Sequence, residues 1–374
     1  MAVTRSLGRA GLHVTTAEAA PEALAGHSCY ARGHLESPCP QMAPKAYVSW
    51  LAKVMAERSF NFVVPVTEVT SQLLLNCKEE LSGLSLPFAD YDTVMALADK
   101  GHLMKRAAEL RIPHPETRWF AHAGELNQGA VEYPVVLKPC LSKIFTGESW
   151  VATRVRVLSS ADQLQQELDS CPYLHQYPFM LQAFIPGKGA GIFCLYDQGR
   201  PVTYFAHKRL REKPPEGGVS VLCESAVPDP TMQAYASRLL DEVGWHGVAM
   251  VEFRVAPDGT PYLMEVNTRF WGSLQLAVDA GVDFPRLLWE VHQGRAPRGP
   301  EEYKVGQRLR WLLGDIDSLY LYLRGHRTLK EKGRRLLAFA TPRLSGLLHE
   351  VNRRGDLGPA WFEFKRYLKD LTGH

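Results

Sequence analysis

The chain has 374 residues, of which 45% are hydrophobic and 22% are charged. A single hydrophobic core rarely grows beyond ~250–300 residues, so we expect two or more packed domains. This composition excludes an intrinsically disordered chain, and a net charge of +3 gives no reason to expect a nucleic acid as partner.

The sequence also lacks the usual marks of export or of a membrane span. No apolar run reaches the ~18 residues that cross a bilayer, and the start of the chain has no signal-peptide pattern. The seven cysteines are irregularly spaced and form no CxxC pair, which is typical of free thiols in a reducing compartment. We therefore expect a cytoplasmic protein without a membrane or nucleic-acid partner.

Residues 1–95 alternate helical and strand patterns, which predicts a small doubly wound α/β domain. Residues 2–11 are typical of a helix and residues 12–16 of a short strand, so we expect this sequence to lack the strand that normally opens such a domain, either because it starts late or because the domain has lost that strand. Residues 60–66 form an apolar run followed by polar residues. That pattern predicts a buried parallel strand that ends at a crevice.

Residues 92–110 are expected to form one helix, which stops where Pro113 and Pro115 block its continuation. A strand that ends near Lys138 is then followed by a polar, glycine-containing loop at residues 142–149. The other elements expected in the middle of the chain are strands at 151–158 and 179–185, helices at 161–168 and 230–243, a hairpin of 192–196 with 201–207, and a loop at 212–220.

A hairpin with facing acids is the strongest local signal. Two apolar strands flank the turn signal Asp258-Gly259. Centring the hairpin on this turn puts Glu252 directly opposite Glu265, and strand alternation puts Asn267 on the same face. Facing carboxylates repel unless a cation lies between them, and hard oxygen donors favour Mg²⁺ over zinc. The pattern therefore predicts a magnesium site, the alternative being an exposed hairpin with acids on its surface.

Several basic residues accompany the acids along the chain. Arg269 follows Asn267 by two residues, where it would meet the negative charge of a phosphoryl group in transfer. Lys138 is a candidate phosphate ligand because lysine serves phosphate as a point charge. Lys208 and Arg209 precede the loop at 212–220 and could cover phosphates or hold an anionic substrate. For each of these side chains the alternative is an ordinary surface charge.

Several common catalytic motifs are absent from the sequence. There is no GxxxxGK[ST] P-loop, no HExxH and no GxSxG. The run Gly-Lys-Gly-Ala-Gly at residues 187–191 lacks the GxGxxG spacing of dinucleotide-binding proteins. A P-loop nucleotidase, a zinc-dependent protease and a serine hydrolase of the α/β type are therefore excluded as interpretations.

Taken in order, these segments resemble the ATP-grasp superfamily, which includes carbamoyl-phosphate synthetase, biotin carboxylase and D-alanine–D-alanine ligase. The resemblance covers residues from about 95 to 295 and is greatest to carboxylate–amine ligases. The segments that carry it are Asp99-Lys100, residues 112–117, residues 133–139 with Lys138, residues 180–187, Gly217-Gly218, Val251-Glu252-Phe253, and Met264-Glu265-Val266-Asn267-Thr268-Arg269.

The resemblance implies an α/β protein with a grasp of the α+β type and four parts. These are a pre-grasp α/β domain at 1–95, a small grasp lobe with its linker at 96–178, a large grasp lobe with the metal site at 179–299, and a helical C-terminal segment at 300–374. Relatives often dimerise, so a homodimer is a further expectation.

The resemblance also implies the roles of individual residues. Lys100 and Lys138 would contact ATP, with Lys138 on its phosphates, while the loop at 142–149 would cover the triphosphate. The backbone of Gln182, Ala183, Phe184 and Ile185 would hydrogen-bond adenine. Glu252, Glu265 and Asn267 would hold Mg²⁺ or Mn²⁺, Arg269 would stabilise the acyl-phosphate step, and Lys208 and Arg209 would reach phosphate or substrate.

These roles imply a ligase that uses ATP and Mg²⁺ to activate a carboxylate as an acyl phosphate and joins it to an amine. Two alternatives remain open from the sequence: an ATP-dependent carboxylating or carbamoylating enzyme that uses bicarbonate, and a non-catalytic ATP-binding protein. The sequence departs from many relatives in one respect, because no acid that could bind the ribose lies between Gln182 and Tyr196.

Overall fold

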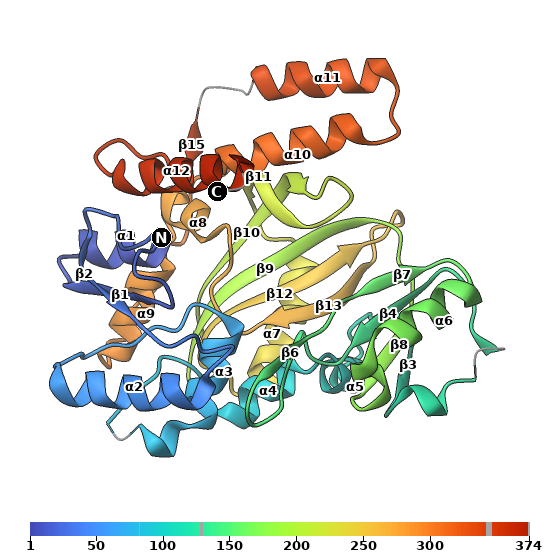
Figure 1. The fold of residues 1–374 in the computed structure, drawn as a ribbon, viewed down its shortest axis with the longest axis horizontal. Helices are drawn as coiled ribbons and strands as arrows, with labels where there is room; N and C mark the ends of the chain where they lie inside the picture. Colours follow the sequence, from blue (N-terminus) through green and yellow to red (C-terminus); the bar gives the residue numbers. More distant parts are fainter. Residues whose placement is uncertain (82, 128–129, 342–345, 373–374) are drawn as a thin grey trace.

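The computed structural model describes residues 1–374 except residues 82, 128–129, 342–345 and 373–374. A seven-stranded sheet forms its centre, with the strands in the order β13-β12-β9-β10-β11-β14-β15 (Figure 1). Residues 192–196 of β9 are all buried, which is typical of a strand covered on both faces. The strands are β9 (Lys188–Asp197), β10 (Arg200–Lys213), β11 (Val219–Ala226), β12 (Gly247–Val255), β13 (Pro261–Asn267), β14 (Arg308–Arg310) and β15 (Leu347–His349).

A smaller lobe is built on a four-stranded antiparallel sheet in the order β3-β8-β4-β7, and it has a hydrophobic core of its own around Leu137, Leu164 and Phe179. Its sheet carries the helix α6 (Ala161–Ser170). The strands are β3 (Thr117–Phe120), β4 (Val135–Pro139), β7 (Arg156–Leu158) and β8 (Phe179–Ala183), and a separate hairpin joins β5 (Lys143–Phe145) to β6 (Trp150–Ala152).

The N-terminal region pairs two parallel strands, β1 (Val14–Glu18) and β2 (Ala31–Glu36), beside helices α1 (Ala2–Arg9), α2 (Pro44–Glu57) and α3 (Glu68–Asn76). The α/β class is therefore confirmed, but the strand expected at residues 60–66 is wrong. These residues, all of them described, form no strand. Phe62 instead packs its ring on Trp289 at 5.1 Å, so the apolar run covers the core with side chains rather than joining a ladder.

The helix expected at residues 92–110 is two helices, α4 (Tyr91–Ala98) and α5 (Lys100–Glu109). Asp99 breaks it because its carboxylate accepts hydrogen bonds from the backbone N–H groups of Gly101 and His102, which makes it the N-cap of α5. The strand expected at 151–158 is likewise split between β6 and β7, which belong to different sheets. The loop expected at 212–220 is shorter, because β10 and β11 extend into it.

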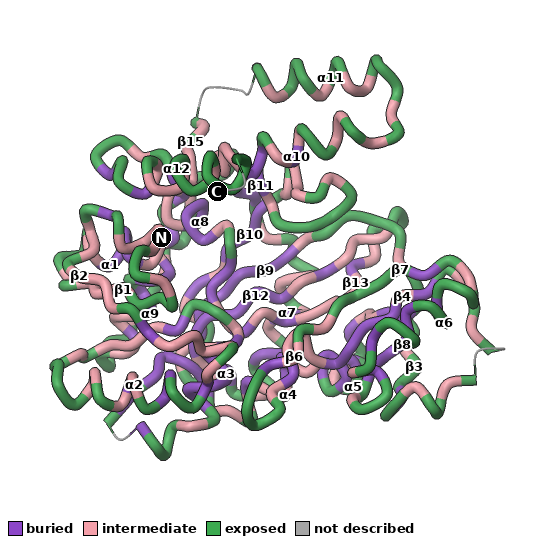
Figure 2. Tube along the Cα trace, in the orientation of Figure 1, coloured by how far each residue is buried: buried purple, intermediate pink, exposed green. Residues whose placement is uncertain are grey.

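The remaining helices cover the central sheet and the upper end of the molecule in Figure 1. In the described part of the chain, no helix is long and apolar enough to cross a bilayer. Figure 2 shows that burial is concentrated in the central strands, while the C-terminal helices are largely exposed. These helices are α7 (Pro230–Glu242), α8 (Leu274–Ala280), α9 (Phe284–His292), α10 (Leu312–Arg324), α11 (Leu329–Ala340) and α12 (Gly358–Thr372).

Candidate active site

The hairpin of β12 and β13 brings two acids face to face. Glu252 is the direct partner of Glu265 across the ladder, as predicted, and the register shifts immediately after this pair. Asn267 donates a hydrogen bond from Nδ2 to Oε1 of Glu252 at 3.0 Å. The three side chains proposed from the sequence as metal ligands therefore lie together on one face of the sheet.

Arg209 reaches the same pair from the neighbouring part of the sheet. Its Nη2 donates to Oε2 of Glu252 at 2.9 Å, and its Nη1 donates to Oε1 of Glu212 at 3.3 Å. To reach Glu252 the guanidinium crosses β9, which lies between β10 and β12 in the sheet, and it passes over Gly189. Nothing in the sequence indicated this contact, since 43 residues separate the partners.

Two buried lysines approach the acids from the opposite side of the site. Lys138, in β4, donates from Nζ to the backbone carbonyl of Met264 at 2.8 Å. Nζ of Lys100 donates to Oγ of Ser142 at 2.8 Å and lies 3.9 Å from Oε2 of Glu265. Both lysines are about 5% exposed. Lys138 thus comes from the small lobe and Lys100 from α5, while both acids and Arg209 come from the large sheet.

The charges of this site act on one another. Burial raises the pKa of Glu252, and the facing charge of Glu265 raises it further against the opposing effect of Arg209. Burial also opposes ionisation of Glu265, but Lys100, Lys138 and other cations outweigh it and hold the pKa of Glu265 below its usual range. Burial lowers the pKa of Lys138 to about 8, partly offset by Glu265.

Arg269 lies at the edge of the acidic pair. Its Nη1 donates to the backbone carbonyl of Phe270 at 2.8 Å, and its positive charge contributes to the lowered pKa of Glu265. The arginine is half-buried. A guanidinium at this position can meet an anionic group that approaches the two carboxylates.

The segment expected to bind adenine follows the strand β8. Gln182 is buried and its Nε2 donates to Oγ1 of Thr117 at 3.0 Å, so its side chain is used inside the small lobe. The backbone N–H of Ala183 already donates to the carbonyl of Glu116 at 2.9 Å. Phe184 and Ile185 lie beyond the end of β8. They are the members of the predicted segment whose backbone lies outside the sheet ladder.

Lys208 does not join this cluster. Neighbouring residues of a strand point to opposite faces, so Lys208 lies on the face opposite to Arg209, and its side chain is exposed. A register shift near Leu210 then places Arg211 on the far face as well, where its Nη1 lies 3.0 Å from Oδ2 of Asp315 in α10. The basic run therefore serves both faces of the sheet instead of a single loop over phosphates.

The polar segment at 142–149 forms the tip and one strand of the β5–β6 hairpin. The rings of Phe145 and Trp150, the strand pair next to the turn, pack with their centroids 4.9 Å apart. Nζ of Lys143 donates to Oε1 of Gln41 at 2.7 Å, which ties the hairpin to the N-terminal region. Ser142, just before β5, is a site residue that sequence reasoning did not single out, although it begins the predicted loop.

The donor set fits a hard divalent cation. The possible ligands are the carboxylate oxygens of Glu252 and Glu265 and the amide oxygen of Asn267, if that side chain turns its oxygen towards the acids. Oxygen ligands of this kind suit Mg²⁺ or Mn²⁺. The pKa of Glu252 is raised first by burial and then by the facing charge of Glu265, and a cation between the carboxylates would counter both effects. Among the described residues, no group of three or more His, Cys, Asp or Glu side chains is placed to hold a metal.

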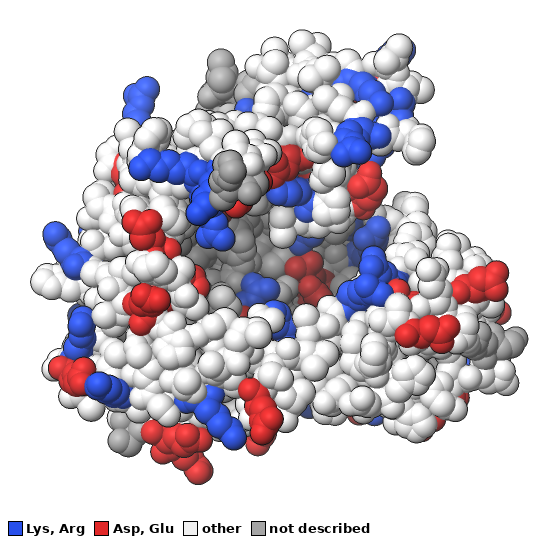
Figure 3. All heavy atoms as spheres, in the orientation of Figure 1, with Lys and Arg blue, Asp and Glu red and all other residues white. Residues whose placement is uncertain are grey.

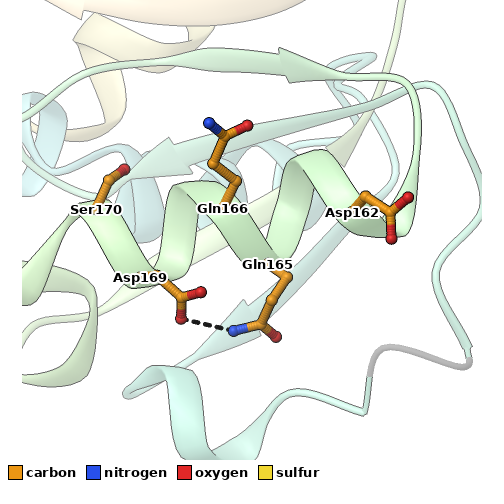
Figure 4. Close-up of a pocket in the computed structure, with 5 residues that line it drawn as sticks. All are labelled: Asp162, Gln165, Gln166, Asp169 and Ser170. Atoms are coloured by element: carbon orange, nitrogen blue, oxygen red, sulfur yellow. Dashed lines mark hydrogen bonds between the residues drawn. The ribbon is translucent and has the colours of Figure 1, made fainter.

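Figure 3 shows that one face of the molecule is hollowed at its centre, with acidic and basic side chains together inside the hollow. A second concave surface runs along α6 and is shown in Figure 4. Because a single face of one helix lines it and it contains no cation, it is not a candidate for ATP chemistry. Its lining residues are Asp162, Gln165, Gln166, Asp169 and Ser170.

Comparison with known proteins gives a family match over part of the chain. Residues 175–314, which include β8–β13 and the two acids, match the profile of a family described as "ATP-grasp in the biosynthetic pathway with Ter operon". A comparison with curated proteins gave no match. The chain therefore carries an ATP-grasp sequence pattern over its large lobe, and the resemblance inferred from the sequence is confirmed.

Solved structures show the same fold. An L-amino acid ligase from Bacillus licheniformis superposes with a TM-score of 0.61 at 19% identity, covering 78% of this chain and 71% of that one. Biotin carboxylase from Campylobacter jejuni gives a TM-score of 0.64 at 16% identity, covering 82% and 71%. An N5-carboxyaminoimidazole synthetase from Staphylococcus aureus gives 0.60 at 11%, covering 82% and 77%. The chain has the ATP-grasp fold.

Proposed function

We propose that this protein is an ATP- and Mg²⁺-dependent ligase that activates a carboxylate as an acyl phosphate and joins it to an amine. The observation that carries the proposal is the facing pair Glu252 and Glu265, with Asn267 beside it and four cationic side chains around it. The carboxylates suit a metal, and the cations suit the phosphates that the metal accompanies.

Each residue of the cluster has a role in this proposal. Lys100 and Lys138 bind the phosphates of ATP from the small-lobe side, and the backbone at Phe184 and Ile185 borders the adenine. Glu252, Glu265 and Asn267 would hold Mg²⁺, which supplies charge neutralisation at the phosphates when bound.

The proposed reaction has two steps. In the first, a carboxylate oxygen of the substrate attacks the γ-phosphorus, the bond to the β-γ bridging oxygen breaks, and ADP leaves. In the second, the amine nitrogen attacks the carbonyl carbon, inorganic phosphate leaves, and the nitrogen gives up a proton. Arg269 stabilises the negative charge that develops in both steps, because it lies beside the acidic pair. Arg209 restrains Glu252 and can turn towards an anionic substrate.

A second candidate is an ATP-dependent carboxylating or carbamoylating enzyme that uses bicarbonate. It is favoured by the similar fold of biotin carboxylase and of N5-carboxyaminoimidazole synthetase. The fold alone does not choose the acceptor, since one fold hosts several reactions. A non-catalytic ATP-binding protein would have no use for two half-buried acids that repel each other.

The test is release of ADP from ATP and Mg²⁺, measured against pools of amino acids and other small carboxylates, each with and without added amines. We expect release that needs both a carboxylate and an amine, with one phosphate formed per ADP. Release with bicarbonate as the sole addition would replace the proposal with the carboxylating candidate. Tight ATP binding without turnover in any pool would replace it with the non-catalytic candidate.

A further inference from the structure

The helices α11 and α12 lie outside the hydrophobic core. α11, described over its whole length, has no buried residue, and in α12 the buried residue is Pro359. Figure 2 shows both helices largely exposed at one end of the molecule. Helices this short gain most of their stability from packing. The exposed faces of α11 and α12 therefore point to a contact with a surface outside this chain.

The exposed face of α11 is apolar. Leu329 is 88% exposed, Leu337 64% and Leu336 47%. Leu329 and Leu336 are seven residues apart, which places them on one face of a helix. The helix is held along one edge of this face, where Nη2 of Arg335 lies 3.3 Å from Oδ1 of Asp315 and the ring of Phe339 lies 4.3 Å from the Arg310 guanidinium.

α12 carries a longer apolar stripe that begins at the residue before it. Its members are spaced by four, three, four and three residues, so they form one line along the helix. The inner side of α12 is the one that contacts the protein, through Phe362 on His27 and Glu363 on Trp311. The stripe consists of Leu357 (64% exposed), Trp361 (59%), Phe364 (43%), Leu368 (44%) and Leu371 (67%).

Positive charge gathers in the same part of the chain. Residues 324–372 contain twelve Lys or Arg and five Asp or Glu, a net charge of +7, although the whole chain carries only +3. The remainder of the protein is therefore net negative. The exposed basic residues that flank the two apolar faces include Lys330, Arg334, Lys365 and Lys369.

We propose that α11 and α12 bind the surface of a membrane that contains anionic lipids. Helices with Leu, Trp and Phe on one face and Lys and Arg beside it bind in the interfacial layer, where apolar burial and charge attraction add. A second copy of this chain is a poorer occupant, because it would bring an equal positive charge against these helices. The sequence-based expectation of no membrane partner rested on the lack of a membrane-spanning segment. A helix that lies on the membrane surface does not need such a segment.

The test is sedimentation of the full-length protein with vesicles of phosphatidylcholine that contain 30% phosphatidylglycerol, compared with pure phosphatidylcholine. Two variants remove one component each: Lys330→Ala with Lys332→Ala and Arg334→Ala removes charge, and Trp361→Ser with Leu368→Ser removes the stripe. Matched controls elsewhere on the surface are Lys53→Ala, whose side chain is 74% exposed, and Met42→Ser, which is 76% exposed. Circular dichroism of each variant confirms that it is folded.

We expect binding to the anionic vesicles that weakens with added salt and falls about fivefold for each basic residue removed. The stripe variant is expected to lose binding, and the two controls are expected to keep it.

Equal binding to neutral and anionic vesicles, or no binding to either at low salt, would overturn the proposal. Binding to soluble polyglutamate without binding to vesicles would also overturn it and identify an acidic polypeptide as the partner. A dimer at micromolar concentration that the stripe variant abolishes would overturn it in favour of a second copy. None of these readouts depends on ligase activity.

Discussion

Glu252 and Glu265 are chemically identical, yet their surroundings move their pKa values in opposite directions. Burial and the facing charge raise the pKa of Glu252, whereas the cations around Glu265 lower its pKa despite burial. Glu265 is therefore the member of the pair that stays ionised, and it is the stronger ligand for a cation.

We accordingly expect Glu265→Gln to abolish ATP turnover, because the variant removes the ionised oxygen while keeping the shape of the side chain. The measurement is the rate of ADP release at saturating Mg²⁺. Glu224→Gln is the matched control: it lies in the same sheet, pairs with Arg308, and is expected to leave the rate unchanged. Near-normal activity of Glu265→Gln would refute the metal assignment.

His207 predicts how stability depends on pH. Burial lowers its pKa to about 3, with a smaller contribution from Arg209. Between this value and the ordinary pKa of ~6.5, the unfolded chain binds a proton that the folded protein does not, so stability is lost as the pH falls. From pH 7 to pH 5 this one group should remove about 2 kcal/mol of unfolding free energy.

His207→Phe should abolish that loss, since phenylalanine has no proton to bind and can keep the ring contact with Phe193, whose centroid lies 4.7 Å away. Urea denaturation at pH 7 and pH 5 measures the effect. Between pH 7 and pH 5, the unfolding free energy of the wild-type protein should fall by about 2 kcal/mol more than that of the variant. Parallel losses in the two proteins would show that His207 is protonated in the folded state.

At the scale of elements, the break between α4 and α5 places Lys100. Asp99 caps α5, and the backbone N–H of the next residue, Lys100, donates to the carbonyl of Cys140 at 2.8 Å. One continuous helix would carry the lysine in a different direction. The Asp99 cap therefore fixes where α5 begins, and with it the position of the Lys100 charge in the candidate active site.

Asp99→Ala is expected to cost about 1 kcal/mol of stability and also to weaken ATP binding, seen as a raised KM for ATP. Asp229→Ala is its control, because Asp229 caps α7 in the same way through the backbone N–H of Met232. The control should lose similar stability, measured by thermal unfolding, without a change in that KM. Equal KM values for both variants would show that the cap does not position Lys100.

The sequence predicted those parts of the site that depend on local pairing. The register of Glu252 against Glu265 follows from one tight turn and strand alternation, so it could be derived from 20 or so residues. Arg209 was a candidate site residue, but its contact with Glu252 could not be predicted this way, since that contact depends on the order of three strands. Lys208 and Arg209 were both proposed for the site because they precede the loop at 212–220, but neighbouring residues on a strand point to opposite faces.

The errors in the fold have similar causes. An apolar run such as residues 60–66 can form either a buried strand or an irregular segment that packs on the core. The pattern alone does not show whether a partner strand is present. The break at Asp99 was missed because the sequence does not show backbone conformation. An Asp that caps a new helix and an Asp on the exposed side of one continuous helix give the same sequence pattern, and here the extended backbone of Asp99 marks the cap.

Over the whole molecule, one buried ion pair joins the N-terminal helix to the C-terminal segment. Nε of Arg5 donates to Oδ2 of Asp356 at 2.6 Å, and both side chains are almost fully buried. Asp356 also accepts hydrogen bonds from Oγ of Ser28 and the backbone N–H of Cys29. Segments more than 300 residues apart in sequence are thereby held at one point.

Asp356→Ala should destabilise the protein by about 3–5 kcal/mol, because it leaves the Arg5 guanidinium buried without its partner. Chemical denaturation measures this loss. Asp370→Ala, an exposed acid at the end of α12, serves as the control and should change stability by less than about 0.5 kcal/mol. A loss below about 1 kcal/mol for Asp356→Ala would mean that the two segments dock independently of the pair.

The hydrogen bond between Lys143 and Gln41 bears on how fast nucleotide enters and leaves. It joins the β5–β6 hairpin to the N-terminal region, and if the hairpin covers the triphosphate as expected, it must release Gln41 for nucleotide to enter or leave. One such bond contributes about 1 kcal/mol, which corresponds to about a fivefold change in a rate constant. Lys143→Ala should therefore speed association and dissociation of a fluorescent ATP analogue together in stopped-flow measurements. The ratio of the two rate constants, and hence the affinity, should stay as it is.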